Sequence, residues 1–92
     1  MPAVPVIGTT DAAGADTYTA IVAARANGQP YTHCTMYCAT KNAIVSFDGG
    51  VTDHLVLVAA QYLNLDDITI TALSAKNETA GQNYTTFVAS CW

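Results

Sequence analysis

The feature that most constrains this chain is a series of short runs in which apolar and polar residues alternate, each ended by turn-forming residues. Alternation at every second position places the apolar side chains on one face of an extended strand. After Lys41-Asn42 these runs cover residues 43–47, 54–58, 62–65, 68–75 and 84–92. In the last run, Phe87, Ala89 and Cys91 fall on one predicted face, and Val88 and Ser90 fall on the other.

Residues 17–39 are compatible with two interpretations. Asp16 is a suitable N-cap for a helix that would run to Asn27 and stop at Gly28. Against the helix, residues 17–22 alternate and are rich in threonine and β-branched side chains, which favour strands. We favour two strands, over residues 17–24 and 31–39, with Asn27-Gly28 as a hairpin turn.

Residues 1–16 hold two prolines and two glycines, so no stable helix is expected there. We predict an extended N-terminal arm over 1–16, in which residues 4–7 can add a strand to a sheet edge of this molecule or of a neighbour. Residues 17–92 are predicted to form one domain. The fold class is all-β: a small antiparallel β-sandwich or barrel of about seven to eight short strands.

The low charge of the chain bears on its partners. Only 11% of the 92 residues are charged, whereas a typical soluble domain has about 25%. Few lysines or prolines are available to keep exposed sheet edges from pairing, which suggests assembly with other subunits. The net charge is −4 and the cations are Arg25, Lys41 and Lys76 alone, so neither nucleic acid nor an anionic membrane is an expected partner.

Targeting and membrane signals are not expected either. No apolar run approaches the roughly 20 residues that cross a bilayer. Met1 is not followed by a basic region and an apolar region of the kind that begins a secretory signal. The chain as given is therefore expected to be soluble and unprocessed.

Asp48, Asp53 and His54 surround the glycine pair Gly49-Gly50 and invite a functional interpretation. Carboxylates and an imidazole can bind a divalent ion or exchange protons. However, Asp-Gly-Gly is also a strong reverse-turn sequence, because glycine adopts positive φ freely and aspartate accepts hydrogen bonds from nearby backbone amides. We predict a turn between two strands.

His33 and the three cysteines are the remaining candidates for a metal site. Neighbours on a strand face opposite sides, so His33 and Cys34 are not expected to share a ligand. On one strand Cys34 and Cys38 would lie about 13 Å apart, beyond the roughly 7 Å limit for a disulfide. A bond from Cys91 to one of them stays open, but three buried thiols in a reducing cytosol are predicted.

Other chemistry-bearing residues have plain structural interpretations. Asp66-Asp67 is expected to be a turn with solvated charges. Two glycosylation sequons begin at Asn77 and Asn83, and both are attributed to chance. The serines are predicted to lie inside strands: Ser46, Ser74 and Ser90. The tyrosines are predicted to be scattered over the sheet faces: Tyr18, Tyr31, Tyr37, Tyr62 and Tyr84. No catalytic, cofactor-binding or metal-ligating residue is assigned, and the chain is predicted not to be an enzyme.

The segments "NAIVSFDGGVTDHLVLVA", "LDDITITALSAKN" and "AGQNYTTFVASCW", within residues 42–92, resemble small β-sandwich accessory proteins of tailed-bacteriophage virions. The resemblance implies a capsid decoration or cement protein that stabilises the head shell by bridging capsomers. A capsid decoration or cement protein is favoured. The alternatives are a small tail or adaptor subunit and a host-attachment or carbohydrate-binding module. The implied protein is a non-enzyme without a cofactor, made in the host cytoplasm and located on the virion, with the capsid exterior favoured.

The same resemblance implies that the partners are the major capsid protein or other virion subunits. Family members of this kind form homo-oligomers, often around a symmetry axis. A trimer is favoured because capsids offer threefold sites.

Overall fold

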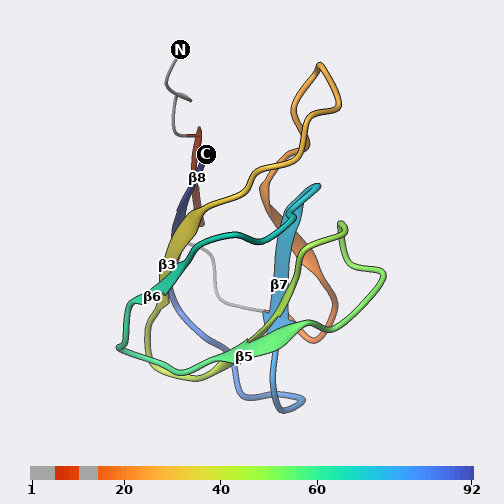
Figure 1. Cartoon of the computed structure of the whole chain (residues 1–92). Helices are drawn as coiled ribbons and strands as arrows, with labels where there is room; N and C mark the ends of the chain where they lie inside the picture. Colours follow the sequence, from red (N-terminus) through yellow and green to blue (C-terminus); the bar gives the residue numbers. More distant parts are fainter. Residues whose placement is uncertain (1–5, 11–14) are drawn as a thin grey trace.

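Eight short strands make up the structure, a computed structural model that describes residues 6–10 and 15–92 (Figure 1). The strands are β1 (Val6–Thr10), β2 (Thr19–Val22), β3 (Cys34–Cys38), β4 (Ala43–Ser46), β5 (Leu55–Leu57), β6 (Leu63–Leu65), β7 (Leu73–Asn77) and β8 (Phe87–Cys91). No helix occurs within the described ranges, so the helix considered for residues 16–27 is wrong. The predicted all-β class is confirmed.

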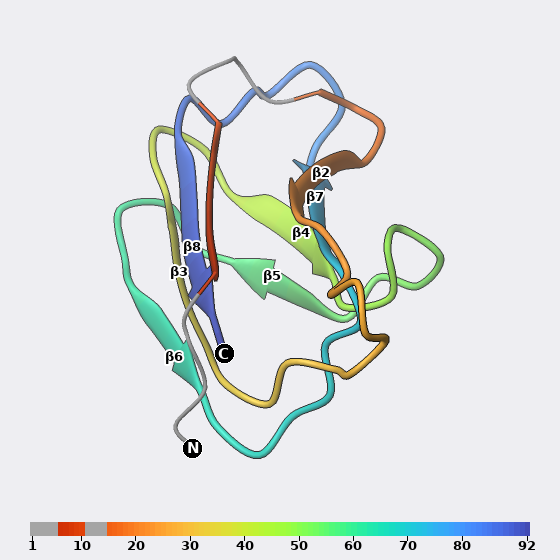
Figure 2. The same cartoon turned by 90° about the horizontal axis from the view of Figure 1, so that it is seen from above.

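The strands form two antiparallel sheets of four, as expected of a small β-sandwich (Figure 2). One sheet has the order β1-β8-β3-β6 and the other has the order β2-β7-β4-β5. The core contains buried residues from both sheets, such as Met36 and Phe87 from the first and Val45 and Leu73 from the second. Each sheet therefore turns one apolar face toward the core.

The period-two pattern of the sequence explains which side chains reach this core. Along β8, Phe87, Ala89 and Cys91 are buried, whereas Val88 is exposed. The faces predicted for this run are therefore confirmed. In β3, buried and half-buried residues alternate in the same way.

The predicted hairpin at Asn27-Gly28 is wrong. A turn is present, since the Gly28 amide donates to the carbonyl of Arg25 at 3.0 Å and Gly28 has a φ of 75°. However, β2 pairs with β7 in one sheet, and β3 pairs with β6 and β8 in the other. The turn therefore leads from one sheet to the other, because the partner of β2 is supplied by a strand far along the chain.

Tyr31 lies outside β3, although the sequence predicts a strand over residues 31–39. It precedes β3, forms an isolated bridge with Ile70, and is 1% exposed. Its hydroxyl donates to the carbonyl of Ala23 at 2.7 Å, and the Arg25 guanidinium lies 4.6 Å from the ring centroid. Tyr31 is thus a core residue with a satisfied hydroxyl.

The strand expected near residues 4–7 is present at Val6–Thr10, where β1 pairs with β8 of the same chain. The sequence left open whether this strand pairs within the molecule or with a neighbour, and the structure contains the pairing within the molecule. The division of the chain at residue 16 stays a prediction, and the parts of the arm at 1–5 and 11–14 lie outside the described residues.

Candidate functional site

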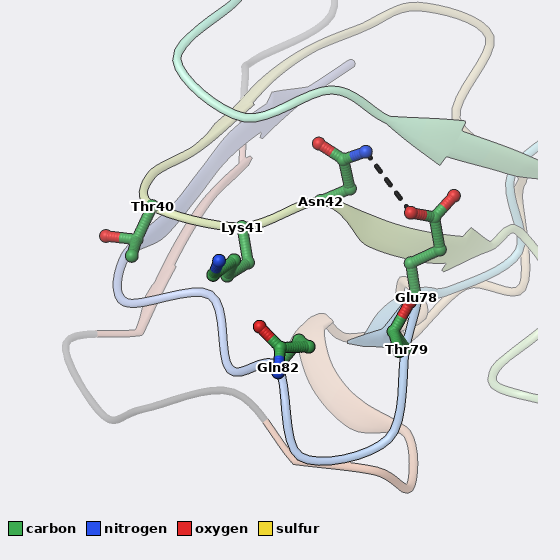
Figure 3. Close-up of a pocket in the computed structure, with 6 residues that line it drawn as sticks. All are labelled: Thr40, Lys41, Asn42, Glu78, Thr79 and Gln82. Carbon is green, nitrogen blue, oxygen red and sulfur yellow. Dashed lines mark hydrogen bonds between the residues drawn. The ribbon is translucent and has the colours of Figure 1, made fainter.

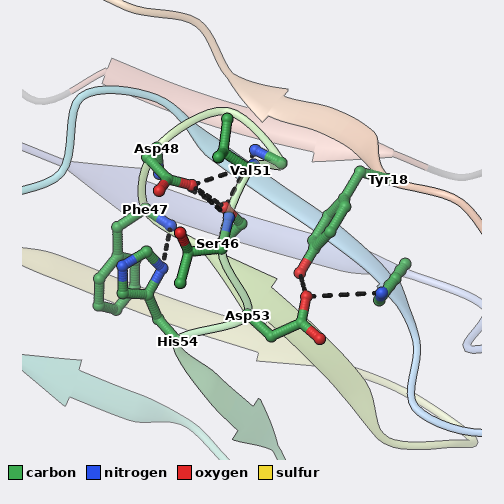
Figure 4. A network of polar contacts seen from close by, with 10 residues as sticks. Tyr18, Ser46, Phe47, Asp48, Val51, Asp53 and His54 are labelled. Atoms are coloured by element: carbon green, nitrogen blue, oxygen red, sulfur yellow. Dashed lines mark hydrogen bonds and ion pairs between the residues drawn. The ribbon is translucent and has the colours of Figure 1, made fainter.

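The turn after β4 is held by one carboxylate. Asp48 Oδ1 accepts hydrogen bonds from Ser46 Oγ at 2.6 Å, from the Val51 amide at 3.1 Å and from the Thr52 amide at 2.9 Å (Figure 4). These bonds lower the pKa of Asp48, with the Ser46 hydroxyl making the largest contribution. Asp48 is therefore used by the turn itself, which is the structure that the Asp-Gly-Gly sequence predicts.

Asp53 has different partners. Its carboxylate accepts a hydrogen bond from the Tyr18 hydroxyl and lies 3.4 Å from Lys76 Nζ (Figure 4). The Tyr18 hydrogen bond, followed by the Lys76 charge, lowers the pKa of Asp53, while burial and the carboxylate raise the pKa of Tyr18. Lys76 Nζ also lies 4.8 Å from the Tyr18 ring centroid. This Tyr18–Asp53–Lys76 cluster connects three segments that are distant in sequence.

His54 uses Nδ1 for a contact other than the two aspartates. Its ring stacks on Phe47 with centroids 4.7 Å apart, and Nδ1 accepts a hydrogen bond from the Phe47 amide at 3.0 Å. Asp48, Asp53 and His54 therefore each bind a different local partner. Their arrangement stabilises the turn and does not present one common ligand position.

The lowered pKa values lead to a prediction about acid stability. Because the folded-state pKa values of Asp48 and Asp53 lie below their ordinary values, their stabilising effect is full above about pH 4 and is lost as the pH falls through the folded values. We expect Asp48→Asn to lower the denaturant midpoint near neutral pH and to change it little at the acid end. The measurement is urea unfolding over a pH series. Asp67→Asn, at an exposed position outside this turn, is the control and should leave the midpoint near neutral pH unchanged.

The histidine and cysteine candidates lie on opposite sides of their sheet. His33 stacks on Trp92 with centroids 5.5 Å apart and places Nε2 3.9 Å from Asp66 Oδ1 on the outside, whereas Cys34 is buried in the core. All three cysteines are buried, as predicted. Within residues 6–10 and 15–92, no three His, Cys, Asp or Glu side chains converge as metal ligands.

The other candidates also have structural partners. Ser46, Ser74 and Ser90 lie in strands as expected, and Ser46 Oγ accepts a hydrogen bond from the Gly50 amide at 3.0 Å. Asn77 and Asn83, which begin the two sequons, bind each other, with Asn77 Nδ2 2.6 Å from Asn83 Oδ1.

Asn77 also links two more distant segments. Its Nδ2 donates to Asp16 at 2.9 Å, and its amide donates to the Ala15 carbonyl at 2.7 Å. Asn77, which is 4% exposed, therefore connects the segment before β2 to the end of β7 through hydrogen bonds. Asp66 and Asp67 are exposed next to β6, as the expected solvated turn requires.

A polar groove lies between two turns and was not anticipated from the sequence (Figure 3). It has a volume of about 270 Å³, and Asn42 Nδ2 donates to Glu78 Oε1 across it at 3.2 Å. Its lining residues are Thr40, Lys41, Asn42, Glu78, Thr79 and Gln82. The groove contains opposite charges and amides, which can bind a small polar molecule.

An apolar corner, formed by Tyr37, Val56, Val58 and Tyr62, is the most unusual surface feature. Val56, Val58 and Tyr62 line a hollow of about 90 Å³ and are 45%, 48% and 73% exposed. The Tyr62 ring lies against Tyr37, with centroids 4.8 Å apart. The expected scatter of tyrosines is therefore wrong at this place, because strand pairing brings residues 37 and 62 together.

The apolar corner adjoins two outer strands. β5 pairs only with β4 and β6 pairs only with β3, so each leaves one side of its backbone unpaired within the described sheets. Their sequences, Leu-Val-Leu and Leu-Asn-Leu, contain neither lysine nor proline. Outer strands that lack these two residue types have fewer barriers to pairing with a further strand, although their shortness limits the length of such a pairing.

No known protein family matches the chain, and no curated protein or solved structure is significantly similar to it. Among the described residues, no helix has the length and apolar character needed to span a membrane.

Proposed function

We propose that this chain is a structural subunit of a bacteriophage virion, most specifically a decoration or cement protein that bridges capsomers on the head shell. The observation that carries the proposal is the apolar corner next to two outer strands that contain neither lysine nor proline. Such a surface suits contact with other subunits better than lasting exposure to water. The resemblance of residues 42–92 to virion accessory proteins supplies the virion context.

The corner favours association between copies of this chain. The apolar corner contains no charged side chain; its residues are Tyr37, Val56, Val58 and Tyr62. Two copies can therefore contact each other through their corners without bringing like charges together, although each chain has a net charge of −4. Tyrosine is among the residues enriched at interfaces, because its ring is large and its hydroxyl remains compatible with water.

The outer strands offer a second type of contact. An added strand would pair with the free backbone groups of β5 or β6 and give the contact a defined register. A trimer is the preferred state because it would match the threefold positions of an icosahedral shell. The major capsid protein or another virion subunit would then bind the assembled trimer.

The proposal predicts a mass well above that of a monomer at micromolar concentration, measured by sedimentation velocity. Val56→Lys should weaken the association by about 10²- to 10³-fold, because it places an unpaired charge inside the contact. Val51→Lys is the matched control. Val51 is 84% exposed in the turn after β4 and lies outside the corner, so this variant should associate normally. A wild-type chain that stays monomeric, or equal weakening by both variants, would contradict the proposal.

Location on the virion is a separate measurement. Gold-labelled antibody against the chain should mark the heads of purified particles in negative stain. Label confined to tails would favour the tail or adaptor subunit, and unlabelled particles would contradict a virion role.

The contact between Tyr37 and Tyr62 also favours a second candidate, a carbohydrate-binding module. The exposed Tyr62 ring, next to the half-buried Tyr37 ring, provides an apolar surface with a hydroxyl at its edge, which suits stacking against a sugar. A glycan array distinguishes the two. Binding that is lost in Tyr62→Ala would support the module, and an array without binding would remove it.

A further inference from the structure

Cys34 and Cys91 lie opposite each other in the centre of one sheet. They are register partners on β3 and β8, which run side by side (Figure 2). Their Sγ atoms are 2.8 Å apart. Both residues are buried, at 1% and 0% exposure. The two thiols therefore face each other inside the core although 57 positions separate them in sequence.

The backbone around this pair has the geometry that a cross-strand disulfide needs. The adjoining pair, His33 and Trp92, exchanges both backbone hydrogen bonds, each at 3.0 Å. Because hydrogen-bonded and non-hydrogen-bonded pairs alternate in an antiparallel ladder, Cys34 and Cys91 form a non-hydrogen-bonded pair. In such pairs the Cα atoms lie about 4.5 Å apart, within the range of roughly 4.4–6.8 Å seen in disulfides. The strands need not move for the bond to form.

We propose that Cys34 and Cys91 are a disulfide site that closes when the chain meets a peroxide. The two S–H bonds break and one S–S bond forms, so the thiols lose two protons and two electrons. One hydrogen peroxide molecule accepts them and leaves as two water molecules. This inference is independent of the proposed virion role.

The reaction proceeds in two steps. One of the two facing thiols attacks the peroxide, becomes a sulfenic acid and releases one water molecule. The other thiol then attacks that sulfur, forms the S–S bond and releases the second water molecule.

Cys38 provides an internal comparison. It lies on the same face of β3, but its register partner on β8 is Phe87. Its thiol donates to the carbonyls of Lys41 and Leu57 at 3.5 and 3.7 Å, and burial raises its pKa to about 11. Cys38 therefore stays a thiol under the same treatment.

The bond would restrict the unfolded chain strongly, because it closes a loop between residues 57 positions apart. From the loop-closure entropy of this span, we expect the equilibrium constant for unfolding to be about 10³-fold smaller for the linked chain than for the reduced chain. It would also fix β8 to β3 within the sheet that carries the Tyr37 side of the apolar corner.

The test uses the full chain, reduced and then treated with hydrogen peroxide. We expect thiol titration of the unfolded product to show one free thiol of the three in the sequence, and the intact mass to fall by two hydrogen atoms. Trypsin should yield fragment 26–41 linked to fragment 77–92. Cys38→Ser should preserve this link, and Cys34→Ser or Cys91→Ser should abolish it.

If a serine variant fails to fold, tandem mass spectrometry of the linked wild-type fragments, with the remaining free thiol alkylated, shows whether Cys34 or Cys38 is bonded to Cys91. Three free thiols, a link through Cys38, or a bond between two chains would overturn the proposal.

Discussion

Phe87→Ala is expected to lower the free energy of unfolding by about 3–5 kcal/mol. Phe87 is fully buried at the start of β8 and packs edge-on against Tyr84, with ring centroids 5.8 Å apart. Alanine would leave a cavity between the sheets and remove this aromatic contact. Since small domains have a total stability of about 5–15 kcal/mol, the variant would lose a large fraction of it.

Urea unfolding, followed by tyrosine and tryptophan fluorescence at one fixed protein concentration, measures this effect. Val88→Ala is the matched control, because Val88 is the next residue of β8 and faces outward. Its expected cost is about 0.5 kcal/mol or less. Equal costs at the two positions would mean that the register of β8 is not the one described.

The parts of the fold that depend on neighbouring residues were predictable from the sequence. Asp48 and Gly49-Gly50 predict a turn, and the apolar alternation on either side predicts the two strands that it joins. These features are local, because a turn is stabilised by its own amides and carboxylate. The inward face of β8 follows from the same period-two rule.

Pairings between distant segments were not predictable in the same way. Asn27-Gly28 predicts that the chain turns, but it does not determine which strand pairs with β2. That choice depends on which arrangement buries the most apolar surface, and β7, about 50 residues further along, provides it. The predicted hairpin failed for this reason.

The contacts that matter most for the proposals belong to this second group. Alternation places Cys34 and Cys91 at inward positions, yet only the register between β3 and β8 brings their sulfur atoms together. Likewise, Tyr37 and Tyr62 meet because β3 and β6 are neighbours in one sheet. A useful signal was present in the sequence, namely two cysteines on inward faces of separate strands, but it did not identify the pair.

Gly50→Ala is expected to destabilise the fold by about 2–4 kcal/mol, which is the largest effect anticipated for a surface turn. Gly50 has a φ of 102°, a conformation that side chains with a Cβ rarely adopt. In addition, a Cβ at this position would lie 3.2 Å from Cβ and Cγ of Tyr18, whose hydroxyl binds Asp53.

Gly28→Ala separates the two causes of this loss. Gly28 also has a positive φ, of 75°, but a Cβ there would have no atom within 4 Å. The Gly28→Ala variant should therefore lose only the free energy of the backbone strain, about 1–2 kcal/mol, while Gly50→Ala also disturbs the Tyr18–Asp53–Lys76 cluster.

Urea unfolding of both variants, with and without Tyr18→Ala, measures the difference. If the steric contact is real, removing the Tyr18 ring should relieve part of the cost of Gly50→Ala and none of the cost of Gly28→Ala. Equal losses in the two glycine variants would show that backbone strain alone is responsible.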